Sequence, residues 1–339
     1  MQQWRCVEVK VDKPKVTIAV VPRERFSVSL PSLASIYTET DTNFELLYID
    51  GNSPAHVAEQ LQKQSLAKGF RLLRYNRYLC PNEARNIAIK QCDTDYIVFV
   101  DNDTFFQREW LNALIECADS TDCAVVAPLY LEGPLAAGTV HFAGGEGHID
   151  CRPGGNYYVQ DHFFERHKLS EVRSQIKRMP VNLVEFHVLL VRRNLFDETG
   201  LLDEEFINIA AENDFSLTVI KAGKVMYFEP ESVITYDYKF PFEWSDMPFF
   251  TLRWSAMWTE ASVKRMCQKW NLAKNDPFIG HASDFRYRQR RIALLPATAL
   301  TTLFGSRCAK FVERVFVKLI GESTQFAHRF QTAVMVKDS

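Results

Sequence analysis

Residues 95–103 read Asp95-Tyr96-Ile97-Val98-Phe99-Val100-Asp101-Asn102-Asp103, five apolar residues followed by two carboxylates one residue apart. A short apolar run rich in β-branched and aromatic residues is typical of a strand buried on both faces, as central parallel strands are. Ligands of open α/β sheets bind beyond the carboxyl ends of such strands, so we expect Asp101 and Asp103 at a ligand site. Two neighbouring carboxylates suit Mg²⁺ or Mn²⁺, although an Asp-Asn-Asp turn that merely ends a strand would have the same sequence.

The composition is that of a globular protein. The chain has 339 residues, of which 47% are hydrophobic and 24% charged, and its formal net charge is -2. This balance predicts a sizeable core and gives no support to nucleic acid as a partner. Eight scattered cysteines without a Cys-x-x-Cys pair favour reduced thiols. Because no apolar run approaches the roughly 20 residues that span a bilayer, we expect a cytoplasmic protein, soluble or peripheral on the inner face of the membrane.

Strands alternate with helices through residue 127. This alternation predicts a parallel sheet with right-handed crossover connections, flanked by helices. The expected strands cover residues 16–21, 44–49, 71–75, 96–100 and 123–127, and the expected helices cover 30–38, 54–68, 81–92 and 110–118.

The organisation of the chain changes after residue 128. Between 129 and 182 periodicity is lost and glycines accumulate, which predicts a long loop region or elements that periodicity does not reveal. Strand patterns then resume over 183–191 and, on either side of Pro230, over 225–228 and 232–236. We assign residues 1–238 to one α/β domain. Aromatic residues and arginines dominate 239–339, which we expect to form a helical extension. Its basic and apolar stretch 286–320 would either contact an anionic membrane surface or form the solvated face of a helical subdomain.

Two motifs in this order resemble the family 2 glycosyltransferases of the GT-A fold. The first is Asn82-Glu83-Ala84-Arg85-Asn86-Ile87-Ala88-Ile89, followed by Val98-Phe99-Val100-Asp101-Asn102-Asp103. The second runs from 189 to 217 and includes Gly200-Leu201-Leu202-Asp203-Glu204 and Ala211-Glu212-Asn213-Asp214. The resemblance covers residues 15 to about 237. It implies a Rossmann-like, mostly parallel sheet and a hexosyltransferase-type enzyme that uses a nucleotide-sugar donor.

The resemblance also implies which residues bind the donor. Asp50, after the second strand, would contact the nucleotide base, and Arg85 would lie near the nucleotide. Asp101 would lie near the ribose or the metal. The implied nucleotide-sugar-binding residues are Pro22, Asp50, Arg85, Asp101 and Asn102.

A divalent cation, Mn²⁺ or Mg²⁺, is the cofactor that the resemblance implies. Asp101 and Asp103 would be ligands of this cation. The family has a histidine ligand after the strand that ends here at Tyr236, where this sequence has Asp237. Asp237 either substitutes for that histidine or the third ligand is absent. A cation in this place would neutralise the diphosphate leaving group of the donor.

The acidic motif would supply the catalytic base. Glu212 and Asp214 are the candidates, separated by Asn213 where the acidic pair of the family is adjacent. We favour Glu212, because Asp214 begins a segment that resembles the helix following the motif. One base opposite the leaving group suits a single displacement, which predicts inversion at the anomeric carbon. The acceptor would be a carbohydrate or lipid-linked hydroxyl, bound beside the loop region 129–182, and surface polysaccharide biosynthesis is the setting suggested by analogy.

Other functions fit these residues less well. A haloacid-dehalogenase-type phosphatase has Thr or Val where Phe105 stands, and a sugar nucleotidyltransferase needs a glycine-rich loop that residues 22–26 lack. A catalytically silent sugar- or nucleotide-binding scaffold on the same fold stays open as the alternative, since fold does not fix function.

Histidines of the central region do not predict a metal site. Their spacings match no zinc pattern, so we expect most of them to be loop or acceptor-site residues. We expect His187 to be a core histidine within a strand. The residues considered are His141, His148, Cys151, His162 and His167.

Overall fold

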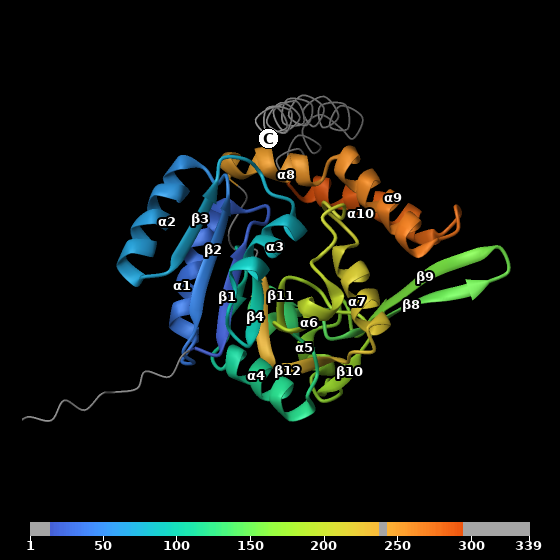
Figure 1. The fold of residues 1–339 in the computed structure, drawn as a ribbon, viewed down its shortest axis with the longest axis horizontal. Coiled ribbons are helices and arrows are strands. Elements are labelled where there is room, and N and C mark those ends of the chain that lie inside the picture. Colours follow the sequence, from blue (N-terminus) through green and yellow to red (C-terminus); the bar gives the residue numbers. More distant parts are fainter. Residues whose placement is uncertain (1–13, 237–242, 294–339) are drawn as a thin grey trace, which may run out of the picture.

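The computed structural model describes residues 14–236 and 243–293 as an α/β structure built around one large sheet (Figure 1). A separate two-stranded hairpin projects from it. The strands are β1 (Val16–Val21), β2 (Glu45–Gly51), β3 (Arg71–Tyr75), β4 (Tyr96–Asp101), β5 (Phe105–Phe106), β6 (Val125–Glu132), β7 (Thr139–Phe142), β8 (Gly145–Arg152), β9 (Gly155–His162), β10 (Met179–Val181), β11 (Val188–Arg192) and β12 (Met226–Tyr236).

Helices flank the sheet and form the described part of the C-terminal region. Among them, α3 packs against β1 and β2, and α4 packs against β6 and β12. The helices are α1 (Ser29–Glu39), α2 (Ala55–Lys68), α3 (Pro81–Gln91), α4 (Trp110–Thr121), α5 (Leu169–Val172), α6 (Leu195–Thr199), α7 (Ala211–Lys221), α8 (Met247–Arg253), α9 (Ala256–Trp270) and α10 (Pro277–Ala293), with short 3-10 turns η1 (Phe26–Val28), η2 (Leu135–Ala137) and η3 (Trp244–Asp246).

The ten-stranded sheet is mixed. Its order is β10-β12-β6-β11-β4-β1-β2-β3, with β5 on β12 and β7 on β6. The pairs β1–β2, β1–β4, β2–β3 and β6–β12 are parallel, whereas β11 runs antiparallel between β4 and β6. The predicted fold class, a Rossmann-like sheet flanked by helices, is confirmed. The insertion of β11 brings its first residues to the edge where β4 ends.

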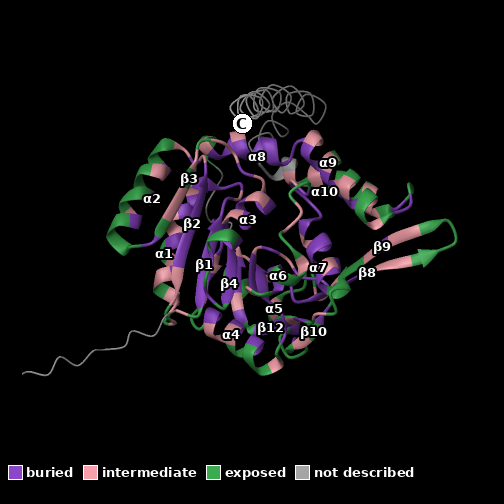
Figure 2. Ribbon diagram, viewed as in Figure 1, coloured by how far each residue is buried: buried purple, intermediate pink, exposed green. Residues whose placement is uncertain are grey.

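Burial follows the predicted pattern in the centre of the sheet. Every residue of β1 and of β4 is buried, and Figure 2 shows these strands as the buried centre of the molecule. Strands covered on both faces need no alternation of polar and apolar residues, which is why their sequences are continuous apolar runs. The buried core contains both strands together with residues of the flanking helices.

The structure differs from the sequence prediction after residue 128. Residues 129–182 are not one long loop, because they contain the end of β6, all of β7 to β10, and α5. The hairpin strands β8 and β9 are largely exposed or half-buried, so no apolar alternation marked them. The predicted strand 183–191 begins only at Val188. The two strands expected around Pro230 form the single strand β12, which passes the proline through an irregularity between Glu229 and Val233.

Residues 243–293 contact the sheet domain through aromatic and polar side chains. The Phe249 ring lies 5.4 Å from Phe26 and 6.4 Å from Trp258 between centroids. The Ser27 hydroxyl and backbone amide both donate to Asp246. No helix within the described ranges is long and apolar enough to cross a membrane. Most of the predicted membrane-contact stretch, from 294 to 320, lies outside the described residues.

Candidate functional site

Three strands meet at one edge of the sheet. Val21, the last residue of β1, pairs with Asp101, the last residue of β4. Because β11 is antiparallel to β4, it begins at this edge, and the Asp101 amide donates to the His187 carbonyl at 2.9 Å. The segments 22–25, 101–103 and 185–187 therefore lie side by side at the carboxyl edge, as expected for a ligand site in an α/β sheet.

Arginines pair with the two predicted metal-ligating carboxylates. Arg23 Nη1 donates to Asp101 Oδ2 at 2.7 Å, and Arg25 Nε donates to Asp103 Oδ2 at 3.2 Å. The Arg25 guanidinium lies 4.2 Å from the centroid of the Tyr236 ring, and the Tyr236 hydroxyl donates to Asp103 Oδ2 at 3.1 Å. Burial alone would raise the pKa of Asp101, but Arg23 and the neighbouring histidine hold it at about 2. Asp101 is thus held anionic by its cationic partners, whereas burial raises the pKa of Asp103 above its usual value against the charges of Arg25 and Arg23.

Arg85 joins the same group from α3. Its guanidinium lies 3.9 Å from the centroid of the Phe186 ring, and Nη2 lies 3.8 Å from Asp101 Oδ1. Burial lowers the pKa of Arg85 to about 10, with the charges of Asp101 and Glu212 opposing that shift. Arg85 therefore remains a cation at neutral pH. We call Arg23, Arg25 and Arg85 with Asp101 and Asp103 the arginine cluster.

The other predicted donor-binding residues lie at the ends of β1, β2 and β4. Asn102 Oδ1 accepts from the Arg23 amide at 2.7 Å, which fixes the chain directly after Pro22. Asp50 accepts from the Ser53 amide and hydroxyl, each at 2.9 Å, and from Arg74. The structure thus brings Pro22, Arg85, Asp101 and Asn102 together, whereas Asp50 is held by its own neighbours.

The carboxylates of the arginine cluster fit the predicted divalent cation. Asp103 Oδ1 is buried and has no hydrogen-bond partner among the described residues. An oxygen of this kind is a hard ligand of the type that Mn²⁺ or Mg²⁺ takes. Asp101 Oδ2 already pairs with Arg23 and His187, whereas its Oδ1 lies 3.8 Å from Arg85 Nη2. The predicted third ligand, Asp237, lies outside the described residues.

The two candidate bases on α7 have different surroundings. Asp214 is buried and accepts from Lys269 Nζ at 2.8 Å and from Trp270 Nε1 at 2.9 Å. Glu212 is half-buried, and its charge acts on Arg85. Between them, Asn213 donates to the Tyr158 hydroxyl at 2.7 Å and so ties α7 to β9. Asp214 therefore anchors α9, whereas Glu212 lies toward the arginine cluster.

A second polar group lies beside the first. Glu185 Oε2 is 3.3 Å from His141 Nε2 and 3.5 Å from His187 Nε2. One ligand atom from each of these three residues lies within 4.8 Å of the others. Burial opposes a charge on His141, but Glu185 and Glu132 raise its pKa to about 10. We call His141, Glu185 and His187 the histidine cluster.

Two expectations about histidines were wrong. His141 lies in β7, not in a loop, and His187 lies before β11, not within a strand. His187 Nδ1 is 3.0 Å from Asp101 Oδ2 and forms a hydrogen bond with it, so His187 belongs to the site edge and not to the apolar core. The pattern Glu185-Phe186-His187 directly before an apolar strand, with two polar side chains at i and i+2, is the signal that could have found them.

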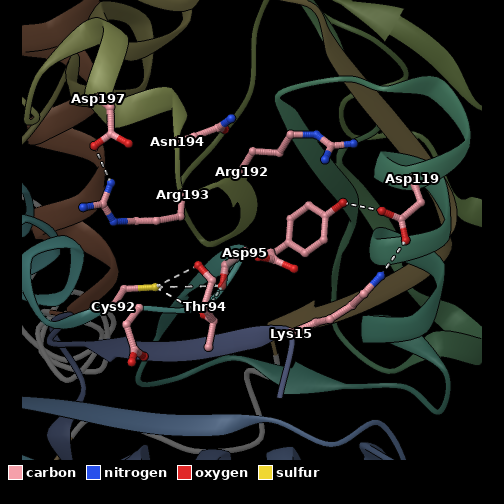
Figure 3. A pocket seen from close by; sticks show the side chains of 11 residues that line it. Lys15, Cys92, Thr94, Asp95, Asp119, Arg192, Arg193, Asn194 and Asp197 are labelled. Atoms are coloured by element: carbon pink, nitrogen blue, oxygen red, sulfur yellow. Dashed lines mark hydrogen bonds and ion pairs between the residues drawn. The ribbon is translucent and has the colours of Figure 1, made fainter. Parts of the chain in front are cut away.

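A hollow of roughly 500 Å³ lies at the opposite edge of the sheet, where β4 begins and β11 ends (Figure 3). Several of its polar groups pair with one another. Tyr96 and Lys15 both bond to Asp119, and Arg193 donates to Asp197 at 3.0 Å (Figure 3). Among the described residues, the buried polar atoms that lack a hydrogen-bond partner and lie close together are instead at the carboxyl edge of the sheet.

Comparison with known proteins shows which family model the segment around this site matches. The model of "Glycosyl transferase family 2" matches residues 24–145. This segment contains Arg85 and both carboxylates of the arginine cluster. The resemblance to family 2 glycosyltransferases is confirmed. Glu212 and Asp214 lie beyond the matched segment, so their assignment as bases stays a prediction.

Relatives and solved structures agree with this family match. An uncharacterised glycosyltransferase of Rickettsia felis is 30% identical over 97 residues, and one of Rickettsia conorii is 27% identical over 97 residues. Each match covers 28% of this chain and only 16% of the relative. GalNAc-T7, solved with UDP, GalNAc and Mn²⁺, has a TM-score of 0.51 at 16% identity, covering 81% of this chain and 54% of that chain. The likeness to GalNAc-T7 shows the GT-A fold.

Proposed function

We propose that this protein transfers a sugar from a nucleotide-sugar donor to an acceptor hydroxyl, with inversion at the anomeric carbon. The observation that carries this proposal is the arginine cluster, where three cations and two carboxylates converge at the carboxyl edge of the sheet. A nucleoside diphosphate presents both an anion for the arginines and a ligand for a carboxylate-bound cation. The family match and the Mn²⁺–UDP complex of the GalNAc-T7 structure support the same reading.

Donor binding would begin with the arginines. Arg23 and Arg85 each lie near one oxygen of Asp101. An entering diphosphate could replace that carboxylate as the acceptor of their N–H groups. Asp101 and Asp103 would hold the divalent cation, which would neutralise the charge that develops on the leaving diphosphate. Phe186 stacks on Arg85 and keeps its guanidinium in one orientation. These side chains bind and orient the leaving group.

We infer that Glu212 accepts the proton of the acceptor. The hydroxyl oxygen forms a bond to the anomeric carbon while the bond from that carbon to the diphosphate oxygen breaks. Its proton passes to a Glu212 carboxylate oxygen, and the nucleoside diphosphate leaves with the electron pair. A single displacement of this kind inverts the anomeric configuration. Asp214 already accepts two hydrogen bonds from α9, which favours Glu212 for this role.

The test is sugar transfer from a panel of nucleotide sugars in the presence of Mn²⁺, measured as released nucleoside diphosphate and as product by NMR. Glu212→Gln should lower kcat by 10²–10⁴-fold, the usual contribution of a positioned base. The matched control is Glu59→Gln, an exposed residue of α2. Retention of the anomeric configuration, or a Glu212→Gln variant as active as the control, would contradict the mechanism.

A catalytically silent nucleotide-sugar-binding protein is the second candidate. The observation that favours it is that Arg23 and Arg25 already pair with Asp101 and Asp103 and neutralise part of the charge that would hold a cation. Binding of a donor without transfer to any acceptor would establish this alternative.

We further propose that the donor sugar is a hexose and that the acceptor is a carbohydrate or lipid-linked. We also propose that the protein is a cytoplasmic enzyme of polysaccharide biosynthesis with peripheral membrane contact.

A further inference from the structure

We propose that His141, Glu185 and His187 form a second metal site, distinct from the carboxylates of the arginine cluster and selective for a zinc-type divalent ion. Two imidazoles and one carboxylate, with a fourth position left for water, make a ligand set that zinc commonly takes. The proposal concerns metal binding by the native chain without nucleotide, so it can be tested independently of the proposed sugar transfer.

The first support is that the three ligand atoms converge at ion-pair distances without a well-formed hydrogen bond between them. Glu185 Oε2 lies 3.3 Å and 3.5 Å from the two Nε2 atoms, yet it accepts no hydrogen bond among the described residues. An imidazole that pointed an N–H at this oxygen would form one. The atoms instead surround a common point, with all three within 4.8 Å of one another. Ligands of a bound ion have this arrangement.

The second support is the partner of each remaining ring nitrogen. His141 Nδ1 lies 3.1 Å from Glu132 Oε1, and His187 Nδ1 lies 3.0 Å from Asp101 Oδ2. A histidine that binds a metal through one nitrogen usually donates its other N–H to a carboxylate, which fixes the tautomer and the orientation of the ring. Both histidines of the cluster have that carboxylate. A simple ion pair between Glu185 and the histidines would not need a second carboxylate behind each ring.

Access and chemistry select the kind of ion. The side chains of His141, Glu185 and His187 are 32%, 13% and 15% exposed, so an ion can enter and a water can occupy an open position. Imidazole ligands favour Zn²⁺ and related ions, whereas Mg²⁺ and Mn²⁺ favour carboxylate and water oxygens. The two neighbouring sites would thus bind different ions: an oxygen-seeking ion at Asp103 and a zinc-type ion at the histidine cluster.

The site would join segments that are distant in the chain. His141 lies in β7, and Glu185 and His187 precede β11, so an ion would link the two segments at the open side of the sheet. His187 also bonds to Asp101. A metal on Nε2 would keep the proton on Nδ1, where it is donated to Asp101. His187 is therefore a positioning residue for the carboxylate of the arginine cluster.

The experiment is titration of the chelator-treated full chain with Zn²⁺ by calorimetry against a competing chelator of known affinity. Co²⁺ serves as a spectroscopic probe, since tetrahedral coordination gives strong visible absorption. We expect one tight Zn²⁺ per chain. His141→Gln and Glu185→Gln should abolish that event, and Glu132→Gln, which changes only the carboxylate behind His141, should weaken it by about 10–100-fold.

The matched control is His148→Gln, which removes an exposed histidine of β8 outside the cluster and should leave the titration unchanged. Circular dichroism of each variant would show whether it folds. If a variant of a ligand residue does not fold, the milder Glu132→Gln variant still tests the site. Equal Zn²⁺ binding by the native chain, His141→Gln and Glu132→Gln would overturn the site and leave an ion-paired cluster. Weaker binding of Zn²⁺ than of Mn²⁺ by the native chain would overturn its selectivity.

Discussion

The arginine cluster and the histidine cluster share one edge of the sheet, yet they neutralise their carboxylates in different ways. Asp101 and Asp103 face guanidinium groups, which keep their protons at any pH that proteins tolerate. Glu185 faces imidazoles, which can release a proton and then bind a metal. His187 contacts both Asp101 and Glu185 and so connects the clusters.

This difference assigns different chemistry to neighbouring groups. At the arginine cluster a diphosphate would give Arg23 and Arg85 new partners, and a cation would bind the carboxylate oxygens beside them, Asp103 Oδ1 among them. The histidine cluster can accept a metal by exchanging it for protons, with no side chain displaced. We therefore expect donor and cation to bind together at the first cluster and a metal to bind alone at the second.

The largest expected effect comes from removing one carboxylate in each cluster. Asp103→Ala removes the carboxylate that pairs with the buried Arg25 guanidinium, and should lower the free energy of unfolding by about 3–5 kcal/mol. Glu185→Ala should cost only about 1–3 kcal/mol, because the histidines that lose their partner can become neutral. Urea unfolding of both variants measures the difference. Arg108→Ala, from an exposed pair, is the control and should cost less than about 1 kcal/mol. Equal losses for Asp103→Ala and Glu185→Ala would remove the distinction.

Metal should stabilise the native chain through the histidine cluster. Zn²⁺ at a hundredfold excess over its Kd should add about 2.7 kcal/mol to the free energy of unfolding, because the ion binds the folded state. The His141→Gln variant should gain much less, while His148→Gln should gain as much as the native chain. Thermal unfolding with and without Zn²⁺ provides the measurement. A gain that is unchanged in His141→Gln would place the ion elsewhere.

The two acidic residues of α7 extend the comparison to activity and stability. Asp214→Asn weakens charged hydrogen bonds from Lys269 and Trp270, and should lower the free energy of unfolding by about 1.5–3 kcal/mol. Its transfer activity, measured at a temperature where it is folded, should stay within tenfold of native. Glu212→Gln should show the reverse, with near-native stability and strongly reduced kcat. A severe loss of kcat in both variants would make Asp214 part of the catalytic group.

Acid pH gives the smallest effect. Burial alone would raise the pKa of Asp203, but hydrogen bonds from Arg265 and the Glu205 amide hold it below its usual value. A lowered folded pKa contributes stability above the unfolded pKa of about 3.9, and that stability is lost as pH falls through the folded pKa. Native protein and Asp203→Asn should therefore differ in urea midpoint at pH 7 and converge toward about pH 3. A constant difference over this range would show that the charge of Asp203 is not the cause.

The sequence predicted Arg85 and both carboxylates of the arginine cluster, but neither Arg23 and Arg25 nor the histidine cluster. The apolar run before Asp101 marks a buried strand, and a parallel sheet places its end at a ligand site. The histidine cluster depends on the antiparallel strand β11, which inserts between β4 and β6, and on β7, which is only four residues long. No local pattern specifies that insertion. His141 and His187 therefore come together only through the topology of the sheet.

The central claim is that the arginine cluster binds a nucleoside diphosphate together with a divalent cation. Its most direct test is a thermal-shift panel of nucleoside diphosphates, with and without Mn²⁺, on the native chain and on Asp103→Asn, which keeps the size of the buried side chain. We predict that one nucleotide raises the Tm of the native chain only with Mn²⁺, and that the rise is lost in Asp103→Asn. No rise with any nucleotide and metal, or a rise that Asp103→Asn retains in full, would contradict the claim.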